Sequence, residues 1–216
     1  MVWESLLTDL VRGLWVTVYV SFTAIAIGFP IGLGLALTRI SNVPVVPRVV
    51  AVYVSLTRAV PLVTLSLFVF FGLPAFGAVP SPVVAGIIAL TISTSGFQAE
   101  IWRSVLSSFP RDQLEAAKAG GMPYLVAFRR IVFPQAARAA LPALMNETTL
   151  LIKASPAVSV IGVVDLTRAA VRVSAVTYEP LLPFLSATVI YVAGVMMLIS
   201  LQRYTESAIV RKYGVL

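Results

Sequence analysis

The sequence has no cysteine and no histidine, and charged residues make up only 12% of its 216 positions. Without cysteine there is no disulfide framework and no thiolate metal site. Without histidine the chain lacks the commonest general base and metal ligand. No Ser/His/Asp, HExxH or P-loop pattern replaces them. We therefore expect no catalytic residue, no metal site and no cofactor bound by this chain.

The composition is that of an integral membrane protein. Hydrophobic residues make up 59% of the chain and the mean hydropathy is +0.96, whereas a soluble domain carries about 25% charged residues. A net charge of +7 fits the basic cytoplasmic loops of membrane proteins, so we expect no nucleic-acid binding. The N-terminus lacks the features of a cleaved signal peptide. We expect one domain covering residues 1–216, without internal repeats.

Apolar stretches of the chain are long enough to cross a membrane as helices. We predict an all-α membrane protein with five transmembrane helices, at residues 11–37, 49–72, 83–106, 137–164 and 181–201.

Small and turn-forming residues predict how these helices pack and connect. Gly28, Gly32 and Gly34 form a strip in the first span that permits close helix packing. Residues 73–82 carry three prolines and no charge, which is typical of an external turn. Residues 165–180 carry charges of both signs, and we expect an external loop suited to meeting a soluble partner.

Basic residues orient the chain, because lysine and arginine accumulate in cytoplasmic loops. One side of the predicted topology holds eleven of them, namely Arg39, Arg48, Arg103, Arg111, Lys118, Arg129, Arg130, Arg138, Arg203, Arg211 and Lys212. The other side holds three, namely Arg12, Arg168 and Arg172. We therefore expect the N-terminus outside and the C-terminus in the cytoplasm.

A polar stretch at residues 110–134 separates the third and fourth spans. Asp112 and Glu115 form a capping-box pair, which predicts the start of a short helix. Gly120 and Gly121 supply the left-handed positions that end a helix. A second helix should follow and break or bend before the next span. The stretch is predicted to be a cytoplasmic helix, turn and helix.

The same stretch resembles the EAA loop in permease subunits of ABC importers. The matching positions are Glu115, Ala116, Ala117, Gly121, Ile131 and Pro134. The resemblance implies that the first helix docks into a cleft on an ATPase subunit, and that these residues couple the two subunits. The alternative interpretation is an amphipathic helix that lies on the bilayer surface.

Two further segments resemble polar amino-acid permeases of this family. Residues 53–62 are similar to the family's Arg-Gly-Thr-Pro-Leu segment, with Ala59 and Val60 in place of the Gly and Thr. Within it, Arg58 should face protein or water, because an arginine facing lipid is costly. We expect Arg58 to be a structural hydrogen-bonding residue near the cytoplasmic end of its span.

Residues 98–103 are similar to the Glu-Ile-x-Arg segment that precedes the EAA loop in this family. Glu100 and Arg103 are three positions apart on a helix, where a salt bridge forms readily. We expect Arg103 to be structural. Glu100 has two open roles, either pairing with Arg103 or lining the translocation path.

Polar residues reach far into the fourth apolar stretch. Asn146, Thr149 and Lys153 share one helical face, with Glu147 one residue to the side. An ionisable residue inside a span indicates a functional site, because it is expensive to leave facing lipid. Pro156 should break the helix nearby. These residues and Glu100 are candidates for the substrate path, and the alternative is a polar network that joins helices.

The resemblance implies the fold, partners and location of the chain. The fold is that of a type I ABC importer permease of the polar amino-acid uptake class, which covers histidine, glutamate, glutamine, arginine and opine systems. The partners are two copies of an ATPase that holds ATP and Mg, a second permease copy or paralogue, an extracytoplasmic substrate-binding protein and membrane lipid. The substrate is a small molecule, an amino acid, and the location is the plasma (inner) membrane of a prokaryote.

Two alternatives remain at this point. The chain could be a permease for another small solute, such as an opine, a sulfonate or an organic anion. It could also be a secondary transporter or channel, which would use no ATPase and would leave the EAA spacing a coincidence.

Overall fold

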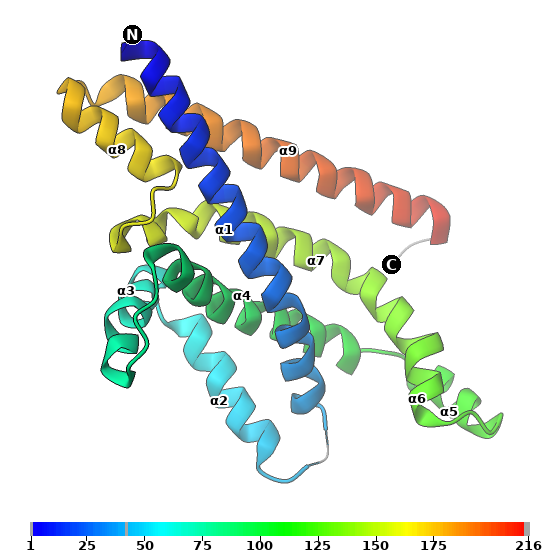
Figure 1. Cartoon of the computed structure of the whole chain (residues 1–216). Coiled ribbons are helices and arrows are strands. Elements are labelled where there is room, and N and C mark those ends of the chain that lie inside the picture. Colours follow the sequence, from blue (N-terminus) through cyan, green and yellow to red (C-terminus); the bar gives the residue numbers. More distant parts are fainter. Residues whose placement is uncertain (1, 42, 214–216) are drawn as a thin grey trace.

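The computed structural model describes residues 2–41 and 43–213, and every regular element among them is helical (Figure 1). The α-helices are α1 (Val2–Arg39), α2 (Val46–Ala59), α3 (Leu62–Gly72), α4 (Pro82–Ser107), α5 (Arg111–Ala119), α6 (Tyr124–Ala127), α7 (Phe133–Ala154), α8 (Leu166–Thr177) and α9 (Leu181–Tyr213). Short 3-10 turns follow α3 at Leu73–Phe76 and α7 at Ser155–Ile161. The predicted all-α class is confirmed.

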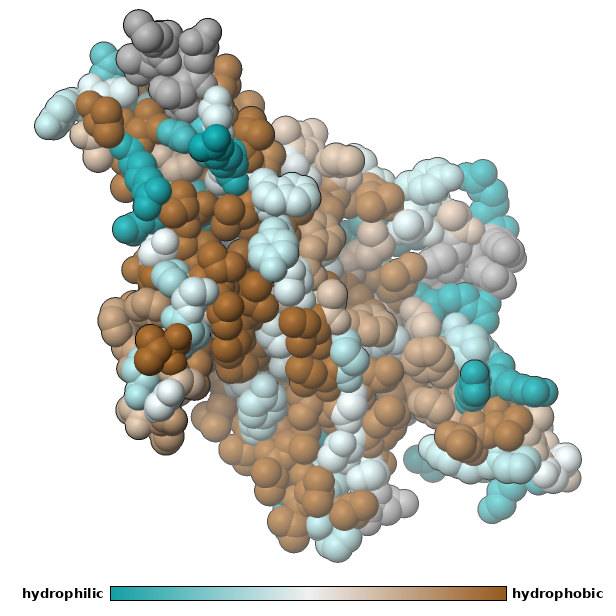
Figure 2. Space-filling model, in the orientation of Figure 1, coloured by the Kyte–Doolittle hydropathy of each residue, from teal (hydrophilic) through white to brown (hydrophobic). Residues whose placement is uncertain are grey.

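Several of these helices have the length and apolarity needed to cross a membrane. Three qualify alone, at Leu7–Arg39, Pro82–Ser107 and Leu181–Ala208, and up to five segments qualify if each of two bent helix pairs counts as one span. Only 6% of the most apolar stretch of α9 is buried. Figure 2 shows apolar residues over the middle of one face and hydrophilic residues towards its upper-left and right-hand edges.

The second predicted span, residues 49–72, is bent rather than straight. α2 ends at Ala59, α3 begins at Leu62, and the two helices differ in direction by 108°. Pro61 lies at the break and has no backbone N–H to donate, and Val60 before it is extended, with ψ 127°. The proline therefore ends one helix and allows the next to start in a new direction.

The region around the fourth predicted span also differs from the expectation. α7 begins at Phe133, directly after a π-helical turn at Phe128–Val132, so Pro134 lies in its first turn. Of the predicted break or bend at this proline, the break is absent and the bend stays a prediction. The break predicted at Pro156 is confirmed, because α7 ends at Ala154 and a 3-10 turn follows.

Residues 165–180, predicted to be a loop, mostly form α8 instead, and their external location stays a prediction. Asp165 precedes this helix, and its Oδ1 accepts a hydrogen bond from the backbone N–H of Arg168 at 2.9 Å. Such a side chain satisfies an amide at the helix start that has no partner within the helix.

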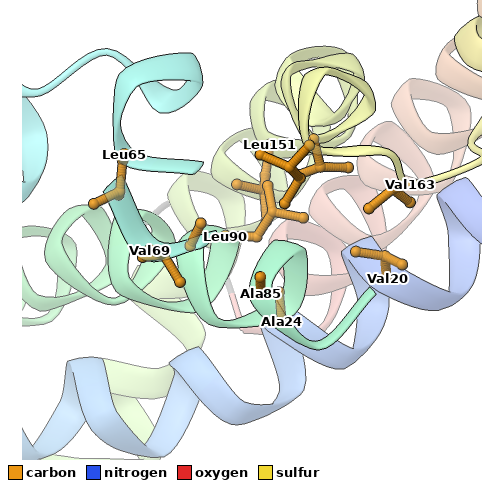
Figure 3. Close-up of a cluster of buried hydrophobic side chains, with 11 residues drawn as sticks. Val20, Ala24, Leu65, Val69, Ala85, Leu90, Leu151 and Val163 are labelled. Atoms are coloured by element: carbon orange, nitrogen blue, oxygen red, sulfur yellow. The ribbon is translucent and has the colours of Figure 1, made fainter. Parts of the chain in front are cut away.

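The main core lies where α1, α3, α4 and α7 meet. Its buried side chains point toward one another in Figure 3, which labels Val20, Ala24, Leu65, Val69, Ala85, Leu90, Leu151 and Val163. Several are small, which allows helix backbones to approach closely. The core thereby joins the N-terminal helix to elements that are distant in the sequence.

Glycines allow α1 to contact α4. A Cβ atom at Gly28 would lie 2.6 Å from Thr94 Cγ2, and one at Gly32 would lie 2.8 Å from Gln98 Cβ and 3.1 Å from a backbone nitrogen of α4. The predicted packing role of these two glycines is confirmed. The same role predicted for Gly34 is wrong within this chain, because a Cβ atom there would have no atom of the described residues within 4 Å.

Replacing Gly32 with alanine should destabilise the protein by about 1–3 kcal/mol, because the added methyl group must push α1 away from the α4 backbone. Gly34→Ala is the matched control on the same helix, and it should leave stability unchanged or raise it, since alanine favours helix over glycine. Thermal unfolding of the purified protein in detergent measures both effects. Equal melting temperatures for the two variants would contradict the packing described here.

Candidate functional site

The turn after α5 has a geometry that depends on Gly121. This residue has φ +73°, in the left-handed region, whereas Gly120 has an ordinary φ of −77°. The N–H of Gly121 donates to Lys118 O and the N–H of Met122 donates to Ala117 O, both at 3.0 Å. This pair of bonds is a Schellman motif, which closes a helix with one left-handed residue. Of the two glycines predicted to be left-handed, only Gly121 is.

The predicted helix, turn and second helix are present, but the start of α5 differs from the prediction. Pro110 occupies the capping position, and no side chain hydrogen bonds to the helix start there. The capping-box pair of Asp112 and Glu115 is therefore wrong. Asp112 lies in the first turn of α5, where a negative charge interacts favourably with the helix dipole.

The EAA-like residues lie on a protruding part of the molecule. Figure 1 shows α5 and α6 at the opposite end of the view from the N-terminus and α8, and no residue of α5 is buried. Glu115 and Ala116 are exposed and Ala117 is half-buried. A hydrogen bond of 2.8 Å from Gln135 Nε2 to Gln113 Oε1 ties α5 to α7. The motif is thus exposed at the surface of the chain.

The protruding part also contains a cavity of about 480 Å³. It is lined by Leu114, Lys118, Met122, Tyr124 and Ala127. The last two EAA-like positions, Ile131 and Pro134, are half-buried behind this surface, where the π-helical turn joins α7. A largely apolar hollow therefore lies next to exposed helix.

Glu100 joins three helices through arginines. Its carboxylate accepts hydrogen bonds from Arg39 of α1 and from Arg103 of α4, with Arg103 Nε at 3.0 Å from Oε1. Arg58 Nη1 of α2 lies 4.0 Å from Oε2. The Glu100 side chain is 27% exposed, so these charges are only partly screened by solvent. The pairing with Arg103 matches the expectation, and Arg39 is an additional partner that the sequence did not indicate.

Arg58 makes a second contact besides its approach to Glu100. Its guanidinium lies 5.3 Å from the centre of the Phe97 ring, the geometry of a cation–π interaction. Nearby, α2 approaches α4 so closely that a Cβ atom at Gly96 would lie 2.2 Å from Thr57 Oγ1. These contacts agree with a structural role for Arg58, which stays a prediction.

Glu147 is part of a buried polar chain between α4 and α7. Gln98 Nε2 donates to Thr94 Oγ1 at 3.1 Å, and Thr94 Oγ1 donates to Glu147 Oε1 at 3.3 Å. All three side chains are buried, and Gln98 Oε1 has no hydrogen-bond partner among the described residues. A buried carboxylate with one hydroxyl partner can accept further hydrogen bonds from a ligand.

The other polar residues predicted on α7 do not join this chain. Thr149 is buried, but its hydroxyl donates to Met145 O of its own helix at 3.1 Å. Asn146 and Lys153 are exposed. Glu147, predicted to lie to one side of the face formed by the other three, is the one that reaches α4.

A second polar junction, at the start of α8, was missed by the sequence reasoning. The hydroxyl of Thr17 on α1 accepts from Leu166 N at 3.0 Å, and Asp165 Oδ2 accepts from the Tyr191 hydroxyl of α9 at 3.4 Å. The signal that could have found it is an aspartate directly before an amphipathic segment, the pattern of a helix start. Asp165 joins α8 to α9, while Thr17 joins α8 to α1.

The family model described as "Binding-protein-dependent transport system inner membrane component" matches residues 28–211 of the chain. The chain belongs to this family. Its members are membrane subunits that work with a separate ATPase, so the expectation that the chain is not an enzyme is confirmed, and the secondary-transporter alternative is not supported.

Several curated proteins are similar to this transport subunit. It is 35% identical over 185 residues to the nopaline transport system permease protein NocM of Agrobacterium fabrum, covering 81% of this chain and 77% of that protein. It is 32% identical over 198 residues to the arginine transport system permease protein ArtQ of Bacillus subtilis, covering 91% and 90%.

Solved structures agree with the fold. An amino acid ABC transporter, crystallised with histidines, superposes with a TM-score of 0.86 at 34% identity, covering 93% of this chain and 94% of that one. The MetNI methionine ABC transporter superposes with a TM-score of 0.81 at 21% identity over 93% and 96%, which supports the fold alone. The expected type I importer permease fold is confirmed.

Replacing Glu100 with glutamine should lower stability by about 1–2 kcal/mol, a fall of several degrees in melting temperature, because two arginines lose their charged partner. Glu179→Gln is the control, since Glu179 is exposed and forms no ion pair among the described residues. Thermal unfolding in detergent measures both variants. If Glu100→Gln is as stable as the control, the arginine cluster does not hold these helices together.

Proposed function

We propose that the chain is the membrane subunit of an ATP-driven importer of amino acids, and that α5 couples it to a cytoplasmic ATPase. The observation that carries this proposal is the exposure of Glu115 and Ala116 on a short helix whose end is fixed by Gly121. The amino-acid substrate is supported by relatives named for arginine and glutamine transport.

The helices behind α5 suit the transmission of a displacement. α6, the π-helical turn and α7 follow one another without a break from Tyr124 to Ala154. When the ATPase subunits close on ATP and Mg, they would push α5, and this helical run would carry the movement to Glu147. In this account Glu115, Ala116, Ala117, Gly121, Ile131 and Pro134 transmit force, and the hydrolysis of ATP takes place in the partner.

The subunit works in pairs in this proposal. Five spans are too few to enclose a path, and homo-oligomers usually pair around a two-fold axis. The poorly buried α9 offers one apolar face for lipid or a second subunit. Two permease subunits, identical or related, would carry two ATPase subunits in the cytoplasm. The N-terminus lies outside, where a substrate-binding protein delivers its ligand.

The substrate path runs past Glu147 in this proposal. Its buried carboxylate suits a ligand with an ammonium or guanidinium group, because a buried charge is stabilised by an opposite one. Asn146, Thr149, Lys153 and Glu100 remain candidates with a weaker basis, since the hydrogen bond that links Glu147 to the buried chain comes from Thr94 and not from one of them. An importer of an opine is the second candidate function, and it is supported by the similarity to nopaline and octopine permeases.

Replacing Gly121 with valine should abolish uptake while leaving the protein in the membrane, because a β-branched residue is strained at a positive φ. Gly120→Val is the matched control, since φ there is −77° and only ordinary contacts surround the site. Uptake of labelled amino acids by cells carrying each variant, with the amount of membrane protein measured, checks the prediction. Wild-type uptake by Gly121→Val would remove the coupling account of this turn.

Replacing Glu147 with glutamine should raise the KM for a cationic amino acid such as arginine, while the KM for a neutral one such as glutamine changes little. The substitution keeps the size and a hydrogen-bond acceptor for Thr94 but removes the charge. Competition in uptake assays gives the ratio of the KM for arginine to the KM for glutamine. Glu206→Gln on α9 is the control. If Glu147 is purely structural, its replacement lowers the uptake of arginine and of glutamine together. An unchanged ratio of the two KM values would therefore assign Glu147 to the helix-joining network.

A further inference from the structure

Four arginines line one cavity of about 520 Å³ where α1, α2, α4 and α5 come together. The cavity is bounded by Arg39, Arg48, Arg103 and Arg111, with Ile40, Pro47, Ala51 and Ser107 between them. None of the described residues that line it is acidic. A hollow of this size with only basic charge is suited to an anion.

Two of the four arginines pair with a carboxylate, which they share, and two do not. Arg39 and Arg103 pair with Glu100, whose two oxygens are used by these contacts. Arg48 and Arg111 form no ion pair with any described residue, and both are exposed. The cavity therefore keeps a net positive charge even when the neighbouring carboxylate is counted.

The cavity lies at the ends of membrane-crossing helices. Arg39 is the last residue of the first such segment, Ser107 is the last of the α4 segment, and Arg48 is in the first turn of the bent pair that begins at Val46. Because these segments end at the cavity, we place it at the level of the lipid headgroups.

α2, which lines the cavity with Arg48 and Ala51, also carries exposed apolar side chains. Val49 and Val52 are 62% and 59% exposed, and Leu56 further along the helix is 59% exposed. These residues follow Arg48 toward the interior of the membrane at helical spacing. A molecule with an anionic head and an acyl chain matches both surfaces at once.

We propose that this four-arginine cavity binds the phosphate group of an anionic phospholipid, whose acyl chain lies along Val49, Val52 and Leu56. Guanidinium groups pair with phosphate oxygens in bidentate geometry, and basic pockets between helix ends are suited to acidic headgroups. Because Arg111 is the first residue of α5, the bound headgroup links this helix to α1 and α2. The site is independent of the proposed transport function.

The test measures lipid retention rather than transport. The full chain, with any subunits that accompany it, is placed in phosphatidylcholine nanodiscs and titrated with phosphatidylglycerol, and bound lipid is counted by native mass spectrometry. The double variant Arg48→Gln/Arg111→Gln should bind roughly 10- to 30-fold more weakly than wild type. Arg203→Gln/Arg211→Gln removes the same charge from the end of α9 and should bind like wild type.

Three outcomes would overturn the proposal. Equal loss of affinity in both double variants would mean that lipid responds only to total charge. Wild-type affinity in Arg48→Gln/Arg111→Gln would mean that the cavity is not the site. If inorganic phosphate alone displaces phosphatidylglycerol completely, the site takes free phosphate and the lipid assignment is wrong. Thermal unfolding without added lipid shows that both double variants are folded.

Discussion

The close approach of α1 to α4, at Gly28 and Gly32, is the constraint on which the rest of the structure depends. Because no side chain separates the two backbones there, Thr94 and Gln98 are buried at the contact. The same packing places Arg39, at the end of α1, against Glu100 of α4. Two glycines therefore determine two features. These are the polar chain that reaches α7 and the arginine cluster around Glu100.

The polar groups held by this contact lie close to the functional parts of the subunit. Glu147 reaches the buried chain from α7, and α7 continues through the π-helical turn to α6 and the turn at Gly121. Movement of α5 would thus act directly on the helix that carries the buried carboxylate. The proposed substrate path and the proposed ATPase contact are two ends of one helical run.

Much of this arrangement is predictable from the sequence, and the reasons are local. The helix and turn at Gly121, the helix break at Pro156 and the family resemblance each depend on residues near one another in the chain. What the sequence could not supply depends on tertiary packing. Arg39 and Glu100 are 61 positions apart, and only the fold decides that Glu147 is buried while Asn146 is exposed. The bend at Pro61 lies inside a continuous apolar run, and such a run by itself predicts a single straight span.

The most direct test of the coupling role of α5 is to purify the tagged chain gently from its native membrane and identify its companions by quantitative mass spectrometry. The account predicts an ATPase at about one copy per permease chain, together with a second permease or an additional copy of this one. Recovery of the chain alone, under conditions in which a control importer stays intact, would contradict the assignment of Glu115 to Gly121 as the ATPase contact.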